Sequence, residues 1–240
     1  MFVNKTAFIL GAGASWHYGY PVGESLVHEV TSRALKLAEF LQQRKRIANV
    51  PQLIEARIPN PLPAGHTPWG YWEVTERECR ELNARLRNVH PLVIDYFLAQ
   101  NPDLQTVGRF LIAWIILECD SQWQQTKKNQ NLVNGPYPPR DKWCRFLLHK
   151  LTSDCRTGAD LLKNNVTFVT FNYDVSLERE LYEGLSSIEM FARATDVPKR
   201  FFSDDRFLHV YGKVRDCPPL DFPKPDEFVA LASQLMAMEQ

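Results

Sequence analysis

The sequence lacks an excess of charge of either sign, and it lacks any close pair of cysteines. Lys and Arg total 28, and Asp and Glu also total 28, so the net charge points to neither nucleic acid nor an anionic membrane as a partner. No CxxC motif is present, so we expect no metal site of the common cysteine type and no redox pair. The cysteines are scattered and odd in number, as expected for reduced thiols of a cytoplasmic protein: Cys79, Cys119, Cys144, Cys155 and Cys217.

Long hydrophobic runs are also missing. The longest apolar run, Phe110 to Leu117, is far too short to span a bilayer. The first residues lead directly into a predicted strand and leave no space for a signal peptide. We therefore expect a soluble, cytoplasmic protein with no membrane partner.

Three segments have the composition of buried strands. Residues 6–10, 166–171 and 206–212 are rich in β-branched, aromatic and aliphatic side chains. Because a doubly wound sheet usually has about five or six strands, either residues 187–192 hide a weaker strand or the chain is the N-terminal part of a longer protein. We predict an α/β fold over residues 1–240, with a Rossmann-like parallel sheet and a helical insertion at about residues 50–155.

Helical periodicity accounts for much of the sequence between these strands. Glu24 to Leu41 has apolar residues at helical spacing. Thr75 and Glu78 form a capping-box pattern, which predicts a helix whose apolar face contains Leu82, Leu86 and Val89. Two further apolar stripes predict helices, the first with Val107, Phe110, Leu111, Trp114 and Ile115, and the second, in residues 141–151, with Trp143, Phe146 and Leu147.

Proline and polar residues mark the predicted connections. Residues 50–70 are rich in proline, which predicts a loop or lid. Residues 124–140 are polar, with Gly and Pro near their end, and predict a flexible connection. After the last strand we expect a proline-rich stretch and then an apolar helix.

The first predicted strand stops at two glycines, Gly11 and Gly13, and a helix is predicted to follow at once. Without side chains, these glycines allow a ligand to come within hydrogen-bond distance of the backbone amides. The small side chains of Ala12 and Ala14 keep the approach open, and the dipole of the following helix would favour an anion. The turn therefore suits a pyrophosphate group, and a tight structural turn is the alternative.

Polar residues also occur at the ends of the other two predicted strands. Asn172 and Asp174 follow residues 166–171, at the sheet edge where open α/β folds bind ligands. An aspartate just before a helix is also a common N-cap, so both roles are open for Asp174. His209 and Tyr211 are two residues apart on the third strand, so their rings project from the same face. The alternative for His209 is a partly buried histidine with its hydrogen bonds satisfied.

These motifs together resemble those of the sirtuins and of bacterial antiphage proteins with sirtuin-like domains. Residues 11–21, GAGASWHYGYP, resemble the NAD-binding loop Gly-Ala-Gly-x-Ser followed by Gly-x-Pro. Residues 170–174 match the motif Thr-Gln-Asn-Ile-Asp at its first, third and last positions. The catalytic histidine of sirtuins directly precedes a glycine, a place that Tyr211 takes here, whereas His209 lies two residues earlier. Residues 94–98 also resemble an Ile-Asp-x-Phe-Leu string in the helical insert of the antiphage domains.

The resemblance implies a role for each matched residue. Asn172 would orient the water and the ribose near the scissile bond, Asp174 would support the nicotinamide-ribose pocket, and His209 would be the catalytic base. The residues implied to bind NAD are Gly11, Ala12, Gly13, Ala14, Ser15, Gly19, Pro21, Thr170 and Tyr211.

We therefore expect an NAD hydrolase that releases nicotinamide and ADP-ribose, with NAD as substrate and no metal. By resemblance it would be an antiphage defence effector that acts as a homo-oligomer or with a partner defence protein. A protein deacylase is a rival function, although the four-cysteine zinc ribbon of those enzymes is missing and their Asp-Phe-Arg string is replaced by residues 22–24, Val-Gly-Glu. A second rival is a sensor that binds NAD or ADP-ribose without turnover, and a third is a structural assembly module.

Overall fold

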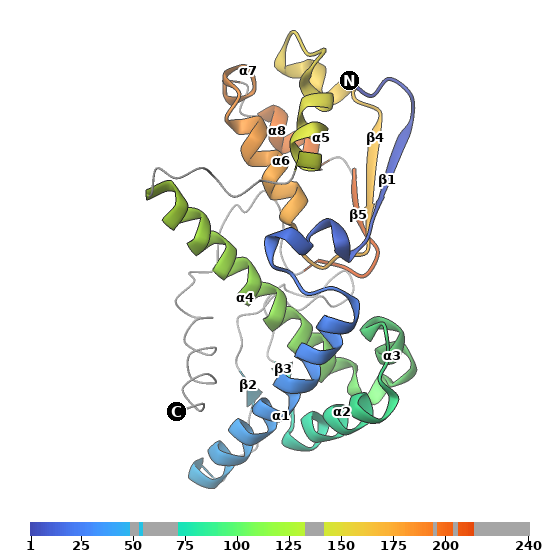
Figure 1. Cartoon of the computed structure of the whole chain (residues 1–240), viewed down its shortest axis with the longest axis vertical. Coiled ribbons are helices and arrows are strands. Elements are labelled where there is room, and N and C mark those ends of the chain that lie inside the picture. The colour runs from blue at the N-terminus through green and yellow to red at the C-terminus, as the bar shows by residue number, and fades with distance from the viewer. Residues whose placement is uncertain (49–52, 55–71, 133–141, 194–195, 204–205, 214–240) are drawn as a thin grey trace. The chain divides into compact units, whose positions relative to one another are not determined.

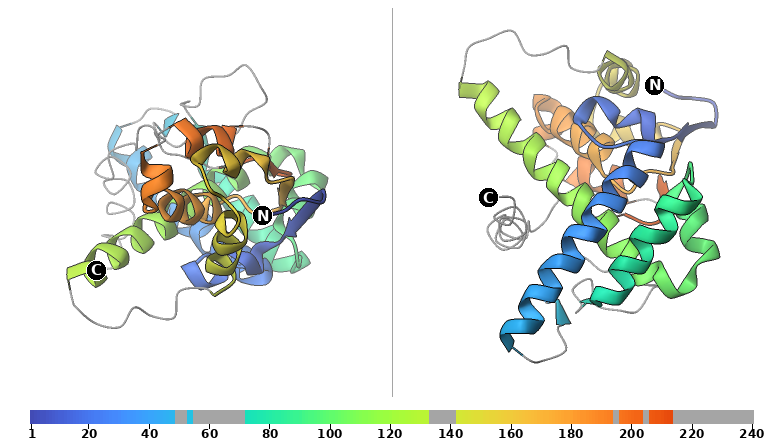
Figure 2. Two further views of the ribbon diagram at one scale, coloured as in Figure 1. Left: turned by 90° about the horizontal axis from the view of Figure 1, so that it is seen from above. Right: turned by 60° about the horizontal axis from the view of Figure 1, so that its bottom comes forward.

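The computed structural model describes residues 1–48, 53–54, 72–132, 142–193, 196–203 and 206–213, which form two compact units (Figures 1 and 2). The first unit contains Met1–Gly19 and the described residues from Trp123 onward. The second contains the described residues of Tyr20–Gln122. The insertion predicted at about residues 50–155 thus coincides with the second unit only in part.

The first unit is built on a parallel sheet of three strands in the order β1-β4-β5. The strands are β1 (Thr6–Leu10), β4 (Val166–Thr170) and β5 (Phe207–His209). A mixed α/β architecture with a parallel sheet is therefore confirmed, and the fuller Rossmann-like sheet stays a prediction. Of the two alternatives considered for the small number of strands, a weak strand at residues 187–192 is excluded, because Glu189–Ala192 forms a short helix, α7, that buries Phe191.

Aromatic rings form the centre of this unit's core. The rings of Phe8 and Phe168 stack at 5.4 Å and those of Phe168 and Phe207 at 4.6 Å, because the strand register places the three residues side by side. Figure 1 shows helices on this side of the sheet, namely α5 (Lys142–Thr152), α6 (Ser176–Ser186), α7 and α8 (Asp196–Ser203).

Side chains alternate between the two faces of a strand, so their neighbours point the other way. On that opposite face, the side chain of Ile9 is 75% exposed and that of Leu208 is 47% exposed. The register of the strands is therefore fixed by the face that carries the stacked rings.

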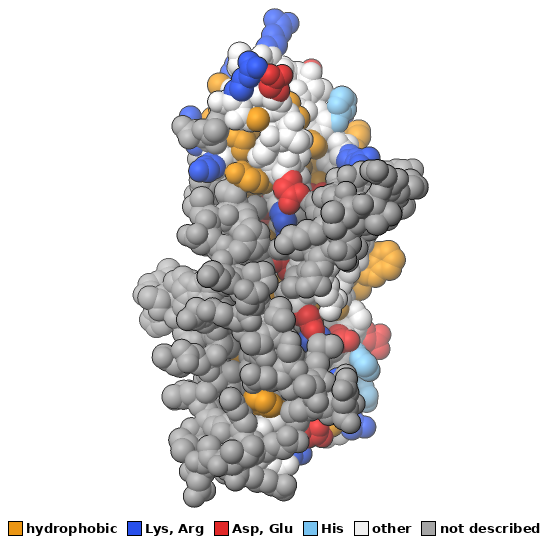
Figure 3. Space-filling model, turned by 90° about the vertical axis from the view of Figure 1, so that its left-hand side faces the viewer, with side chains coloured by type: hydrophobic (Ala, Val, Ile, Leu, Met, Phe, Trp, Pro, Cys, Tyr) orange, Lys and Arg blue, Asp and Glu red, His pale blue; other side chains and the backbone are white. Residues whose placement is uncertain are grey.

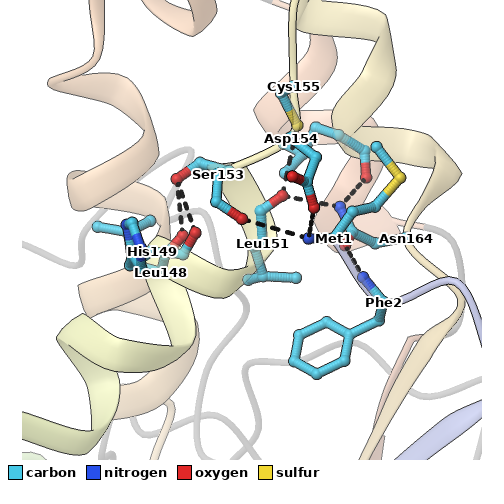
Figure 4. A network of polar contacts seen from close by, with 11 residues as sticks. Met1, Phe2, Leu148, His149, Leu151, Ser153, Asp154, Cys155 and Asn164 are labelled. Carbon is cyan, nitrogen blue, oxygen red and sulfur yellow. Dashed lines mark hydrogen bonds and ion pairs between the residues drawn. The ribbon is translucent and has the colours of Figure 1, made fainter.

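The start of the chain is tied to the end of α5, as Figure 4 shows. The N-terminal ammonium group of Met1 donates to the carboxylate of Asp154 at 2.7 Å. The amide of Phe2 donates to Oδ1 of Asn164 at 2.8 Å, and Nδ2 of this buried asparagine donates to the carbonyl of Leu151 at 3.0 Å. These contacts hold the residues that precede β1, the strand that leads into the glycine turn.

The second unit is mainly helical. Its elements are α1 (Gly23–Ala48), α2 (Glu76–Val89), α3 (Ile94–Gln100), the first part of α4 (Gln105–Leu132), and the antiparallel pair β2 (Leu53–Ile54) and β3 (Trp72–Glu73). Helix α1 packs along α2, and the helices predicted from periodicity are confirmed. Arg33 of α1 pairs with Glu118 of α4 and lies over the ring of Trp114, 5.0 Å from its centroid.

The capping box that opens α2 is confirmed. The amide of Glu78 donates to Oγ1 of Thr75 at 3.2 Å, and Oε2 of Glu78 accepts from the amide of Thr75 at 2.8 Å. Placing Val89 on the buried face was wrong, since its side chain is 62% exposed where α2 ends and His90 takes a left-handed conformation.

Two predictions around α5 also need correction. Phe146 is 61% exposed, because α5 buries Cys144, Leu147 and Leu151 instead. The flexible connection predicted at residues 124–140 was wrong for its first part, since α4 continues to Leu132. Most of the proline-rich loop at 50–70 and the whole predicted C-terminal helix lie outside the described residues.

Three general features of the described part bear on the expectations from composition. On the face drawn in Figure 3, acidic and basic side chains are interspersed. None of the described helices is long and apolar enough to cross a membrane. The four described cysteines, Cys79, Cys119, Cys144 and Cys155, are in no disulfide.

Candidate functional site

The predicted site residues of the first unit gather at the carboxyl edge of its sheet. Leu10, Thr170 and His209 are paired in register, and each lies at the end of its strand. Because all three strands are parallel, the segments that follow them leave the sheet at one edge. The sheet therefore brings the glycine turn, Asn172 and His209 together.

The glycine turn is followed by two short 3₁₀ turns, Ala12–Ala14 and Trp16–Tyr18. The prediction of a helix directly after the glycines was wrong. Gly19 takes a left-handed conformation with φ of 88°, and the long helix α1 begins only at Gly23. The turn therefore has no long helix whose dipole could favour an anion. Pro21 belongs to the second unit.

Neither Gly11 nor Gly13 is required by the fold of the turn itself. Neither has a positive φ, and a Cβ atom added to either would meet no atom within 4 Å. The amides of Ala14 and Ser15 donate to the carbonyls of Gly11 and Ala12 at 2.9 and 3.2 Å. Among the described residues, the exposed Ala12 and Gly13 have no acceptor for their amides. Glycines without side chains, next to amides that have no acceptor, allow an anion to approach the backbone closely and to accept hydrogen bonds from it.

Asn172 is the residue that connects the glycine turn to the strand ends. It is 8% exposed, and its Nδ2 donates to Oγ of Ser15 at 3.1 Å. The Ser15 hydroxyl donates in turn to the carbonyl of Ala12 at 3.3 Å, which assigns the Asn172 contact to its NH₂ group. The backbone amide of Asn172 donates to Oγ1 of Thr170 at 3.1 Å.

One polar atom of Asn172 has no partner. Its Oδ1 is buried and accepts no hydrogen bond from any described residue. A buried acceptor without a donor costs about 1–3 kcal/mol, so such an atom needs an explanation. A donor on a ligand or on a bound water would satisfy it.

His209 is buried between two acceptors. Its Nδ1 lies 3.0 Å from the carbonyl oxygen of Asn172, and its Nε2 lies 2.5 Å from Oε1 of Glu178 in the first turn of α6. The side chains of His209 and Glu178 are only 5% and 7% exposed. Burial by itself lowers the pKa of His209, but the hydrogen bond and the negative charge of Glu178 outweigh it, so the pKa is raised above the ordinary histidine value.

Asp174 acts at the start of the same helix. Its Oδ1 accepts from the amide of Ser176 at 3.0 Å and from the hydroxyl of Ser176 at 2.5 Å, and both residues are buried. This contact holds Ser176, the first residue of α6, and the first turn of that helix contains Glu178. The N-cap of α6 is Val175, so the N-cap alternative for Asp174 was wrong by one position, and a role of Asp174 toward a ligand stays a prediction.

Aromatic side chains lie next to the strand ends. Tyr211 is 46% exposed, and its ring centroid is 5.8 Å from that of Phe171 and 6.3 Å from that of Tyr173. In contrast to His209, Tyr211 thus presents much of its ring to solvent. Because β5 ends at His209, Tyr211 lies beyond the strand, and the prediction that the two rings project from one strand face was wrong.

Sequence reasoning missed Glu178, the partner of His209. It follows Leu177 in an apolar helical stripe, and only its pairing with a strand 31 residues later shows its role. No local pattern in the sequence marks this glutamate as the partner of His209. The described residues contain no group of three or more His, Cys, Asp or Glu that could hold a metal ion.

Comparisons of the chain with protein-family models, with curated proteins and with solved structures give no match. The resemblance to sirtuin-like domains therefore rests on the motifs of residues 11–21 and 170–174 and on the order in which they and His209 occur.

Proposed function

We propose that the first unit binds NAD at the carboxyl edge of its sheet and hydrolyses the bond between nicotinamide and ribose. The observation that carries the proposal is the buried, unpartnered Oδ1 of Asn172. The Nδ2 of the same side chain is linked through Ser15 to the carbonyl of Ala12, in the turn that holds the available amides of Ala12 and Gly13. Amides of this kind suit a pyrophosphate, and a fixed amide oxygen suits a water or a ribose hydroxyl.

In the proposed reaction, the bond between the ribose carbon and the nicotinamide nitrogen breaks, and its electron pair goes to nicotinamide. The leaving group is then neutral, so the site needs no acid to protonate it. The sugar passes through an oxocarbenium-like state, and Asn172 Oδ1 would hold the water that adds to it. As ADP-ribose forms, the water loses one proton, which passes to the solvent.

A sensor that binds NAD or ADP-ribose without turnover is the second candidate. The position of His209 favours it, because both ring nitrogens face protein acceptors and neither is available to take a proton. A site of this kind binds a ligand while lacking a free base at that position.

One assay separates these functions. The whole chain is incubated with NAD, with and without an acyl-lysine peptide, and free nicotinamide is measured by chromatography while ADP-ribose binding is measured by calorimetry. Release without peptide supports hydrolysis, release only with peptide supports a deacylase, and binding without release supports the sensor. Absence of both binding and release would contradict the proposal.

The variant Asn172→Ala tests the residue that carries the proposal. We expect it to weaken ADP-ribose binding and to abolish nicotinamide release, while Asn88→Ala, an exposed asparagine in the last turn of α2, changes neither. Thermal unfolding of both variants shows whether they are folded. A folded Asn172→Ala protein with unchanged binding would remove this residue from the site.

A further inference from the structure

The protons of the Glu178–His209 pair can be counted from its contacts. The carbonyl of Asn172 can only accept, so the Nδ1 that faces it carries a proton. Nε2 lies 2.5 Å from a carboxylate oxygen of Glu178, so one proton lies between the two atoms. Because imidazole is more basic than a carboxylate, we assign this proton to His209, and neither ring nitrogen then has a lone pair to offer to a substrate.

The same contacts determine the orientation of Asn172. Its amide is held by Thr170, its carbonyl by His209 and its Nδ2 by Ser15, at 3.1, 3.0 and 3.1 Å. Three of its four polar atoms are thus fixed, and Oδ1 is the one left for a ligand. Loss of the His209 contact would free the backbone of Asn172 and so the direction of that oxygen.

We propose that Glu178 and His209 are positioning residues that hold Asn172 Oδ1 toward the ligand, and that His209 is not the proton acceptor of the reaction. The inference rests on the proposed function, because it assigns roles within that site. Glu178 takes part through His209, and His209 takes part through the carbonyl of Asn172. Helix α6, whose first residue Ser176 donates to the buried Asp174, is the element that carries Glu178.

The charges around His209 set how the pair responds to pH. Glu178 raises the pKa of His209 and Lys213 lowers it, while burial also lowers it. Because the net shift is upward, the protonated pair is fully formed at pH values below the ordinary histidine pKa and is lost as the pH rises through the raised pKa. Ligand affinity should fall over that same pH range.

Ring-nitrogen NMR of the ligand-free protein tests the pair without any reference to function. We expect the spectrum of His209 to show two protonated ring nitrogens near neutral pH, with the signal assigned from its loss in His209→Gln. Glu178→Gln should lower the pKa of His209, whereas Glu183→Gln, an exposed position on the same helix, should leave it unchanged. A neutral His209 ring with one unprotonated nitrogen near neutral pH would overturn the proposal.

Ligand binding and turnover test the positioning role. We expect Glu178→Gln to weaken ADP-ribose binding about 10-fold, equal to about 1.4 kcal/mol. The double variant Glu178→Ala with His209→Asn keeps a donor toward the Asn172 carbonyl and removes both charged groups. It should bind ADP-ribose more tightly than the single variant His209→Ala, which lacks that donor, and, where the wild type releases nicotinamide, it should keep part of that release.

The outcomes distinguish this inference from the proposed function. If the wild-type chain neither binds ADP-ribose nor releases nicotinamide, the proposed function fails, and the NMR result still decides whether the ion pair exists. If the double variant binds ADP-ribose like the wild type but loses nicotinamide release, His209 is the base and the positioning role is wrong.

Discussion

Replacing Gly13 by alanine should separate ligand binding from protein stability. The new Cβ would meet no atom within 4 Å, and the φ of Gly13 is not positive, so the folded state accepts the methyl group. The unfolded chain loses freedom, which stabilises the protein by about 0.4–1 kcal/mol. For a chain of this size that is a rise in melting temperature of roughly 1–4 °C.

Binding should change in the opposite direction. Under the proposed function, the methyl group of Gly13→Ala would hinder the close approach of a phosphate to the exposed amides of Ala12 and Gly13. Losing one hydrogen bond to a charged group costs about 1.5–3 kcal/mol, so the dissociation constant for ADP-ribose should increase roughly 10- to 150-fold. Calorimetry gives this constant, and thermal unfolding gives the stability of the same sample.

Gly19→Ala is the matched control. Gly19 has a φ of 88°, so alanine there is strained and should destabilise the protein by about 1–2 kcal/mol. A Gly13→Ala protein that loses stability would contradict the described geometry of the turn. A stable Gly13→Ala protein that binds ADP-ribose as tightly as the wild type would refute the role of the turn.

Three other substitutions or treatments test the two units. Phe168→Ala removes the fully buried ring between Phe8 and Phe207, so the free energy of unfolding measured in urea should fall by about 3–5 kcal/mol. A decrease below about 1 kcal/mol would contradict the described core. Thr75→Ala removes the side-chain cap of α2 and should cost about 0.5–2 kcal/mol in the same measurement, with no change if the cap is not formed. Burial and the charge of the neighbouring Glu78 raise the pKa of Cys79 to about 12. Mass spectrometry should therefore find the Cys79 thiol unmodified by iodoacetamide in the native protein and modified once urea unfolds the second unit. Rapid reaction in native buffer would show that Cys79 is accessible.

Local patterns in the sequence were enough to predict the three strands of the parallel sheet and most of the longer helices, but not the short strands β2 and β3. The capping box of Thr75 and Glu78 lies within one helical turn, so its contacts depend only on neighbouring residues. The alternation and composition of residues 6–10 and 166–171 likewise reflect a local period of two residues. Periodicity alone could not show that α2 ends at Val89 or that α5 leaves Phe146 exposed, because both depend on which face neighbouring elements cover.

The candidate site was predictable where it follows from strand ends. Parallel strands end at one edge, so the proximity of Ser15 and Asn172 could be expected before their hydrogen bond was seen. The partner of His209 could not be expected, because the contact with Glu178 joins a helix to a strand across 31 residues. The helix predicted after Gly13 failed for a local reason, the left-handed Gly19 that precedes Pro21.

The position of His209 in the row Leu10–Thr170–His209 also bears on how the edge strand finds its place during folding. If β5 slipped by one residue against β4, Leu208 or Val210 would face Glu178, and a carboxylate would be buried against an aliphatic side chain. Such misaligned molecules are disfavoured by the same charge pair that we assign to ligand positioning. A variant that loses the pair should therefore give a more heterogeneous population of folded molecules, in addition to a weaker site.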